Sequence, residues 1–199
     1  MLLFVNILLF LIALMLIVPR YKNPRVIPNL LSKEECEYII SKAAPNLSIS
    51  TLSRGKSINL KIRKSETAWL GFEDDKIKDI VMKCLKYVNI NNPHYCEKLQ
   101  VLRYEKGGMY KVHQDAEIDD VNKRKHTFIL ALNEGYEGGE TNFPVLKRSY
   151  KLKMGDVLLF DTLDTWGRIP EQALHSGEPL KGGEKWICNL WVHESKYHP

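Results

Sequence analysis

The second half of the sequence is dominated by short β-like runs separated by glycine turns. From Lys98 onward six such runs are rich in β-branched and aromatic residues: KLQVLRYEKGG, MYKVHQD, HTFILALNEG, YKLKMGDVLLFDT, ALHSG and EKWICNLWVHE. Glycine pairs at 107–108, 138–139 and 182–183, with a single glycine at 155, mark turns. Strands in such close succession bury their apolar faces by folding into a β-sandwich or jelly roll.

Two helices are predicted upstream of these strands. In SKEECEYIISKAAP, Ser32 and Glu35 fit a capping box and Pro45 ends the helix. In DDKIKDIVMKCLKYV, Asp74 and Asp75 suit the positive end of a helix dipole, and apolar residues follow at helical spacing. The sequence therefore predicts an α+β domain in which a mainly helical region, residues 30–95, supports the sheet.

The first eighteen residues, MLLFVNILLFLIALMLIV, carry no charged side chain. At 1.5 Å per residue this run is just long enough to span a bilayer core of roughly 30 Å. No basic stretch precedes it and no small-residue cleavage site follows it, which favours an uncleaved signal anchor over a removed signal peptide. We expect one transmembrane helix over residues 1–18 and a proline-containing linker over 19–29.

Basic residues on the linker bear on the orientation of this anchor. Arg20, Lys22 and Arg25 follow the apolar run, and no acidic residue occurs before Glu34. The positive-inside tendency then favours a cytoplasmic domain.

Composition limits the remaining possibilities. The chain has 199 residues, enough for one domain, with 44% hydrophobic and 27% charged residues. Its net charge of +5 is spread among acidic residues, without the basic blocks typical of nucleic-acid binding, so no nucleic-acid partner is expected. Four cysteines, none in a CxxC pair, could form two disulfides, but Cys36 and Cys84 fit buried apolar positions better.

A histidine and an aspartate two positions apart interrupt the run MYKVHQD. In a strand, His113 and Asp115 leave the same face, as a hydrogen-bonded pair, a catalytic pair or two ligands of one metal would. His175, in ALHSG, can supply a third ligand. Two histidines and one carboxylate are the ligands of non-haem Fe(II) oxygenases. Zinc accepts the same set, although no glutamate is placed as a hydrolytic base.

Lys185 lies ten residues after His175, within GGEKWICNLW. A cation so close to large apolar residues either extends to solvent or meets an anion. The other histidines are predicted to be ordinary polar residues, since they have no acidic or histidine neighbour at useful spacing; they are His94, His126, His193 and His198.

Taken in order, LQVLRYEKGGMYKVHQD, RKHTFILALNEGYEGGETNFP, KMGDVLLFD and ALHSGEPLKGGEKWICNLWV resemble the catalytic domain of prolyl 4-hydroxylases, within the 2-oxoglutarate- and Fe(II)-dependent dioxygenases. The resemblance covers about Leu99 to Val192, with a weaker echo in IRKSETAWL from Arg63. Its most specific parts are GGETNFP and the His-to-Lys spacing of ten. It implies a double-stranded β-helix (jelly-roll) core in a dioxygenase domain over residues 96–195.

The resemblance also implies roles for individual residues. Fe(II) would be held by His113, Asp115 and His175. Lys185 would pair with the distal carboxylate of 2-oxoglutarate, in a pocket that Tyr110 and Thr127 would line. Arg103 and Trp191 lie in matching stretches, where a structural role is equally expected.

The implied activity is hydroxylation of peptidyl proline to 4-hydroxyproline by O2, with 2-oxoglutarate decarboxylated to succinate and CO2 and L-ascorbate as a further cofactor. Relatives commonly face the endoplasmic reticulum lumen, which we favour over the cytoplasmic side for a single-pass, membrane-anchored protein. Two alternatives stay open: hydroxylation of a lysyl side chain or nucleobase, where arginine usually binds the keto acid, and a non-catalytic jelly-roll binding module.

Overall fold

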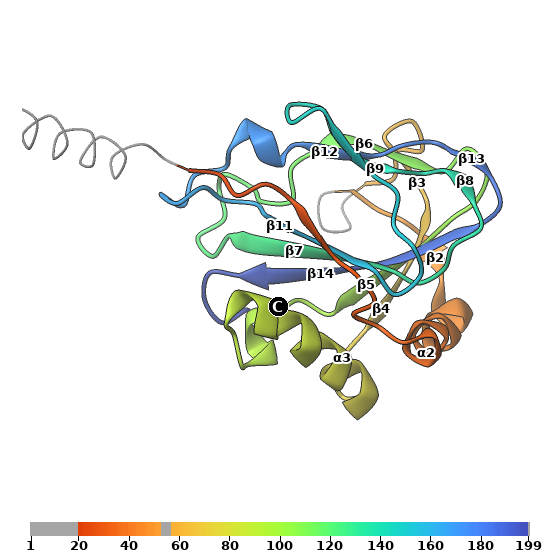
Figure 1. Ribbon diagram of the computed structural model, residues 1–199, viewed down its shortest axis with the longest axis horizontal. Coiled ribbons are helices and arrows are strands. Elements are labelled where there is room, and N and C mark those ends of the chain that lie inside the picture. Colours follow the sequence, from red (N-terminus) through yellow and green to blue (C-terminus); the bar gives the residue numbers. More distant parts are fainter. Residues whose placement is uncertain (1–19, 53–56, 199) are drawn as a thin grey trace, which may run out of the picture.

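Two facing antiparallel β-sheets form the centre of the molecule (Figure 1). The computed structural model describes residues 20–52 and 57–198. The apolar run predicted to cross a membrane, residues 1–18, lies outside these ranges. Within them, no helix has both the length and the apolar character needed to span a bilayer.

The larger sheet has seven strands, all paired in antiparallel fashion. In spatial order they are β1 (Arg25–Ile27), β11 (Val157–Asp161), β7 (Arg124–Ala131), β14 (Lys185–His193), β5 (Leu99–Tyr104), β4 (Glu66–Leu70) and β2 (Ser48–Ile49). All six β-like runs read from the sequence contribute strands to the fold, so this part of the prediction is confirmed.

The smaller sheet has five strands and faces the larger one. Its order is β10 (Arg148–Tyr150), β9 (Thr141–Phe143), β12 (His175–Gly177), β6 (Met109–His113) and β3 (Arg63–Lys64). A short pair, β13 (Leu180–Gly182) with β8 (Glu137–Gly138), closes one end. Two opposed antiparallel sheets of this kind are the jelly-roll core that was expected.

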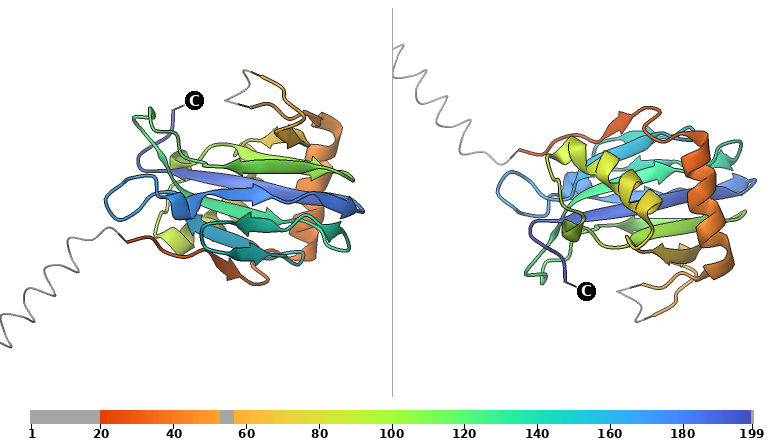
Figure 2. Two further views of the ribbon diagram at one scale, coloured as in Figure 1. Left: turned by 90° about the horizontal axis from the view of Figure 1, so that it is seen from above. Right: turned by 90° about the horizontal axis from the view of Figure 1, so that it is seen from below.

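Both predicted helices are present and cover the outer face of the larger sheet, as Figure 2 shows. Helix α2 spans Lys33–Ala43 and begins with the predicted capping box between Ser32 and Glu35. Helix α3 spans Asp75–Leu85, and the Asp74 carboxylate accepts the backbone N–H groups of Lys76 and Ile77. Short 3-10 turns are η1 (Ala44–Asn46), η2 (Lys86–Val88), η3 (Pro93–Tyr95) and η4 (Glu171–Ala173).

Alternating side chains of the larger sheet build two separate apolar clusters. Phe128 and Leu130 of β7 pack with the helices, whereas Ile129 and Ala131 of the same strand point between the two sheets. All four cysteines are buried and free, and each belongs to the helix-side cluster. Disulfides are therefore not part of this fold, and the cysteines act as small apolar residues.

The N-terminal third differs from its predicted organisation. The region expected to be a linker, 19–29, is not a free spacer, because Arg25–Ile27 pairs with β11 and extends the larger sheet. The region expected to be helical support, 30–95, also contributes β4 to the sheet and β3 to the smaller one. These strands are short, and their pairing depends on contacts far along the chain.

Candidate metal centre and co-substrate pocket

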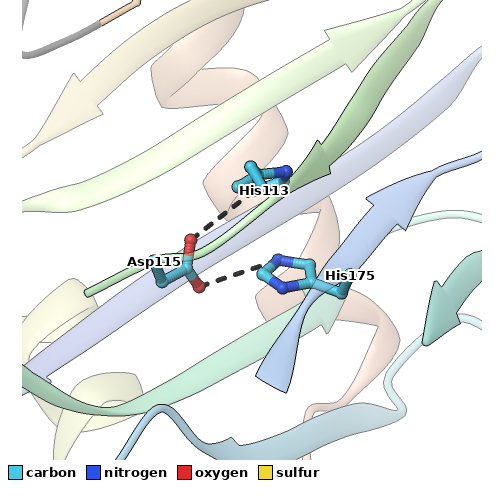
Figure 3. A group of neighbouring side chains, drawn as sticks. All are labelled: His113, Asp115 and His175. Atoms are coloured by element: carbon cyan, nitrogen blue, oxygen red, sulfur yellow. Dashed lines mark ion pairs between the residues drawn. The ribbon is translucent and has the colours of Figure 1, made fainter. Parts of the chain in front are cut away.

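His113, Asp115 and His175 converge in the space between the two sheets (Figure 3). His113 ends β6 and His175 begins β12, and the two are direct cross-strand partners. Asp115 follows β6 by two residues. His113 Nε2 lies 3.7 Å from Asp115 Oδ1, and His175 Nε2 lies 3.8 Å from Asp115 Oδ2. The ligand atoms of all three lie within 4.8 Å of one another. The structure thus brings together the three residues predicted from spacing.

Backbone carbonyls orient both imidazoles. His113 Nδ1 lies 2.7 Å from the Lys111 carbonyl oxygen, and His175 Nδ1 lies 3.1 Å from that of Ala173. An Nδ1–H donating to a carbonyl leaves the Nε2 lone pair free, which is the usual arrangement of a metal-ligating histidine. Two such lone pairs and a carboxylate facing one another fit a divalent iron ion.

Thr127 holds the carboxylate of this group. Its hydroxyl, on the inner face of β7, donates to Asp115 Oδ2 at 2.7 Å, and both residues are buried. Burial by itself would raise the pKa of Asp115, but His175, His113, Arg124 and the Thr127 hydroxyl outweigh it and keep this pKa below its usual value. Asp115 is therefore an anion ready to meet a cation. Thr127, expected to line the 2-oxoglutarate pocket, contacts the Asp115 carboxylate of the candidate metal centre.

Tyr110 lies against His113. Its ring stacks on the His113 imidazole with centroids 3.6 Å apart, and the Arg63 guanidinium lies 4.7 Å from the Tyr110 ring centroid. Burial, followed by the nearby His175, lowers the pKa of His113 to about 3. The imidazole is then neutral in the working pH range, as a metal ligand must be.

Lys185 is buried, with 5% of its surface exposed. Its Nζ donates to the Gly139 carbonyl at 2.6 Å and lies 5.6 Å from the centroid of the Tyr104 ring. Burial lowers the pKa of Lys185 to about 8, and the charge of Lys151 contributes. In the described part of the chain no carboxylate forms an ion pair with it. The reading of Lys185 as a solvated surface lysine is therefore wrong.

Lys185 and His175 both lie beside the apolar cluster between the two sheets. His175 packs against the Phe143 and Phe160 rings, with centroids 5.5 Å and 4.8 Å away. Those phenylalanines share the inter-sheet cluster with Tyr104, beside Lys185. The buried cation and the second histidine of the metal centre therefore border the same inter-sheet cluster.

A buried ion pair lies on the other side of Asp115. Arg124 donates from Nε and Nη2 to the Glu97 carboxylate at 2.5 Å and 3.0 Å, and from Nη1 to the Asp115 carbonyl at 3.2 Å. His193 Nε2 lies 3.0 Å from the same carboxylate. The Arg124 guanidinium also lies 3.6 Å from the centroid of the Trp191 ring. This cluster positions Trp191 and the loop that carries Asp115.

Sequence spacing did not reveal this cluster. Glu97 and His193 lie 96 positions apart in the chain, and no local motif links them. His193 was taken for an ordinary polar residue, as was His126, whose Nδ1 lies 2.7 Å from Asp161 Oδ1. Both predictions are wrong, because the acidic partners lie far away in the sequence. Arg103 is structural, forming ion pairs with Glu66 and Glu184 along the sheet surface.

A cavity of about 720 Å³ opens beside the metal centre. His113 and Asp115 form part of its wall, together with Arg124 and Trp191. Its aromatic lining is Trp69, Phe72, Tyr110, Trp191 and Tyr197. Trp166 and Arg168, in the stretch TLDTWGRIPEQ at 162–172, do not line it.

A jelly roll with two histidines and one carboxylate inside its core defines a class of proteins, the non-haem Fe(II) oxygenases. The family model of the 2OG-Fe(II) oxygenase superfamily matches residues 99–193. The chain is 35% identical to "Probable prolyl 4-hydroxylase 3" of Arabidopsis thaliana over 85% of its own length and 68% of that protein. It is 30% identical to Prolyl 4-hydroxylase 1 of the same plant, over 86% and 70%.

A solved structure of a prolyl hydroxylase has a similar fold. The viral collagen prolyl hydroxylase of Paramecium Bursaria Chlorella virus-1, in its 2OG complex, superposes with a TM-score of 0.69 at 30% identity, covering 87% of this chain and 97% of that one. The chain belongs to the prolyl 4-hydroxylase family of Fe(II)- and 2-oxoglutarate-dependent dioxygenases. The chain is therefore a member of an enzyme class that uses Fe(II), 2-oxoglutarate and O2.

Proposed function

We propose that this protein hydroxylates proline residues in peptides or proteins, with His113, Asp115 and His175 holding Fe(II). The observation that carries the proposal is the meeting of these three ligand atoms between the sheets, with both imidazoles turned by backbone carbonyls so that Nε2 faces the carboxylate. When bound, iron and 2-oxoglutarate activate O2 to oxidise a C–H bond, while the keto acid becomes succinate and CO2.

Lys185 is proposed to bind the distal carboxylate of 2-oxoglutarate. A buried cation without a carboxylate partner is costly, and an incoming carboxylate removes that cost. In the described structure its Nζ donates to the Gly139 carbonyl, a neutral acceptor that an anion can replace or join. The lysine at this position also favours the prolyl reading over the lysyl or nucleobase alternatives, in which arginine is the usual partner of the keto acid.

Tyr110 is proposed to keep the His113 imidazole in place by stacking, and Thr127 to keep the Asp115 carboxylate anionic and oriented. Neither residue transfers a proton in this scheme. They hold the ligands at a fixed geometry while 2-oxoglutarate and the peptide enter and leave.

The large cavity is proposed to bind the peptide. Proline-rich segments dock on aromatic-lined grooves because their extended conformation is already set and their rings pack on aromatic faces. Two polar atoms at this cavity are buried without a hydrogen-bond partner in the described residues, Trp191 Nε1 and Gln114 Oε1. A donor and an acceptor of this kind suit the carbonyl and N–H groups of a peptide backbone.

An activity assay tests this function directly. The full-length protein is incubated with Fe(II), 2-oxoglutarate and a library of proline-containing peptides, and we expect one oxygen added per succinate formed. Ascorbate, a proposed further cofactor, should extend the number of turnovers. Succinate release that no proline peptide stimulates, together with oxidation of a lysyl peptide, would redirect the proposal to another substrate.

The proposed cellular setting follows from sequence alone. We propose that residues 1–18 anchor the protein in the membrane and that the catalytic domain faces the endoplasmic reticulum lumen. The basic residues after the apolar run argue for the opposite side, and glycosylation of Asn46 distinguishes the two orientations.

A further inference from the structure

A second cavity, of about 630 Å³, lies apart from the metal centre at the edge of the larger sheet. Three segments that are distant in sequence form most of its walls: the connector at 20–25, the residues 87–89 around the end of η2, and the stretch 159–167 at and after the end of β11. Lys125 and His126 of β7 and Glu194 complete the lining. Neither the ligand triad nor Lys185 lines it. The mechanism proposed above leaves this cavity without a role.

Hydrogen bonds hold the three walls together. Arg20 N–H donates to Thr165 Oγ1 at 3.0 Å, and Thr165 N–H returns a bond to the Arg20 carbonyl at 3.1 Å. On the opposite wall, Arg25 donates to the Tyr87 carbonyl at 3.2 Å and its guanidinium lies 5.9 Å from the Tyr87 ring centroid. The cavity is therefore a built feature of the fold.

Two of its three carboxylates are already engaged by neighbouring groups. Asp161 accepts from His126 Nδ1 at 2.7 Å. Asp164 accepts the backbone N–H groups of Trp166 and Arg168 at 2.8 Å and 3.0 Å, and forms an ion pair with the Arg168 side chain at 3.2 Å. Both carboxylates keep their charge, and the Arg168 guanidinium offsets that of Asp164.

The cations around the cavity exceed its negative charge. Lys22, Arg25 and Lys125 line the cavity, and in the described ranges none of the three forms an ion pair with a carboxylate. With Arg20, the lining carries four cations against the three carboxylates Asp161, Asp164 and Glu194. Arg168, paired with Asp164, adds a fifth cation, so two positive charges are in excess. His126 adds a nitrogen, Nε2, on the side opposite its bond to Asp161. Flexible cations around a cavity of fixed shape are the ordinary means of holding a small anion.

We propose that this cavity binds a phosphate group, carried either by a soluble phosphate compound or by the headgroup of an anionic phospholipid. A phosphate of charge −1 to −2 matches the excess of cations. The volume of the cavity suits a small phosphorylated molecule or a lipid headgroup. The site is separate from the catalytic one and does not depend on the substrate proposed for it.

The lipid source has a geometric argument in its favour. Lys22 follows the predicted membrane span, residues 1–18, by four positions. Four extended residues reach at most about 14 Å, so a domain anchored by that span keeps this cavity close to the headgroup layer.

Lysine footprinting tests the site. The metal-free full-length protein, in neutral detergent, is acetylated at constant ionic strength with sodium chloride or with inorganic phosphate, and modification at each lysine is measured by mass spectrometry. We expect phosphate to protect Lys22 and Lys125 and to leave the exposed Lys78 and Lys153 unchanged. A second arm uses the protein in phosphatidylcholine vesicles with or without phosphatidic acid and without free phosphate.

Two matched double variants test which lysines determine the affinity for phosphate. The double substitution Lys22→Gln with Lys125→Gln should weaken phosphate binding by about tenfold or more, because two charge-assisted contacts are lost. Lys78→Gln with Lys153→Gln removes the same net charge and should leave binding within about twofold. All four lysines are exposed, so neither variant should affect folding.

The two arms of the footprinting experiment distinguish a soluble ligand from a lipid headgroup. Protection by inorganic phosphate alone supports a soluble ligand, and protection by phosphatidic acid vesicles supports the lipid headgroup. Protection in neither arm, or equal weakening by the two double variants, overturns the proposal.

Discussion

His113 and His175 face each other across neighbouring antiparallel strands, with ring centroids 4.3 Å apart. Their side chains leave the same face of the smaller sheet because they are direct cross-strand partners. Asp115, two residues beyond His113, then needs only a short excursion of the chain to complete the group. A paired register of two strands thus converts a distant histidine into a neighbour of the His-x-Asp pair.

The hydrogen bond from Thr127 to Asp115 should control iron affinity. Thr127→Val keeps the side-chain shape and removes the donor, and loss of such a supporting bond typically weakens metal binding by about 10- to 100-fold. We expect this in an iron titration, with the KM for 2-oxoglutarate little changed once iron is saturating. The opposite pattern, unchanged iron affinity with a raised KM, would assign Thr127 to the co-substrate pocket.

Removing the charge of Lys185 should damage co-substrate binding selectively. Truncating one partner of a buried charge pair costs about 3–5 kcal/mol, so Lys185→Ala should raise the KM for 2-oxoglutarate by about two to three orders of magnitude. Lys185→Arg should lie between, because the guanidinium keeps the charge with a different shape. Iron content should stay at the wild-type level, and Lys181→Ala, at an exposed lysine of β13, serves as the control. A wild-type KM in the Lys185→Ala protein would refute the role.

The same lysine predicts a pH dependence. Burial lowers the pKa of Lys185 to about 8, so in the free enzyme the cation is present below that pH and lost above it. We expect kcat/KM for 2-oxoglutarate to fall by up to about tenfold per pH unit above this value. In the Lys185→Arg protein the fall should disappear, since arginine stays protonated. An unchanged alkaline limb in that variant would place the titration elsewhere.

The Glu97–Arg124 pair should contribute both to stability and to peptide binding. Glu97→Ala leaves a buried guanidinium without its anion, which typically destabilises a protein by about 3–5 kcal/mol. Replacing both partners with methionine should recover much of this loss, because no unpaired charge remains. Denaturant unfolding measures both variants, with exposed Glu105→Ala as the control. The double variant should still bind peptide poorly, since Trp191 loses the cation above its ring.

The sequon at Asn46 to Ser48 reports on the side of the membrane. Asn46 is exposed, so an oligosaccharide can attach without disturbing the core. In microsomes, lumenal placement predicts a mobility shift that a glycosidase reverses and that Asn46→Gln abolishes. Complete digestion of the domain by protease in intact vesicles would instead establish a cytoplasmic orientation.

Local features of the sequence were enough to predict the helices, the six β-like runs and the candidate ligands. Capping residues, apolar periodicity and glycine turns act over a few residues, and each is present as expected around Ser32, Asp74 and the strands of the jelly roll. The His-x-Asp pair and the second histidine were singled out from residue type and from the resemblance to prolyl 4-hydroxylases, and the structure brings the three together. The role of Lys185 was implied by the same resemblance and stays a prediction.

Only the tertiary structure decided which distant groups meet. The addition of β1 to the sheet, the contact of Thr127 with Asp115, and the pairings of Glu97 with Arg124 and His193 all join residues from separate parts of the chain. Each depends on strand order and register, which sum many weak contacts across the whole domain and leave no mark on a short stretch of sequence. The sequence by itself determined which chemical groups were available, and long-range packing determined their partners.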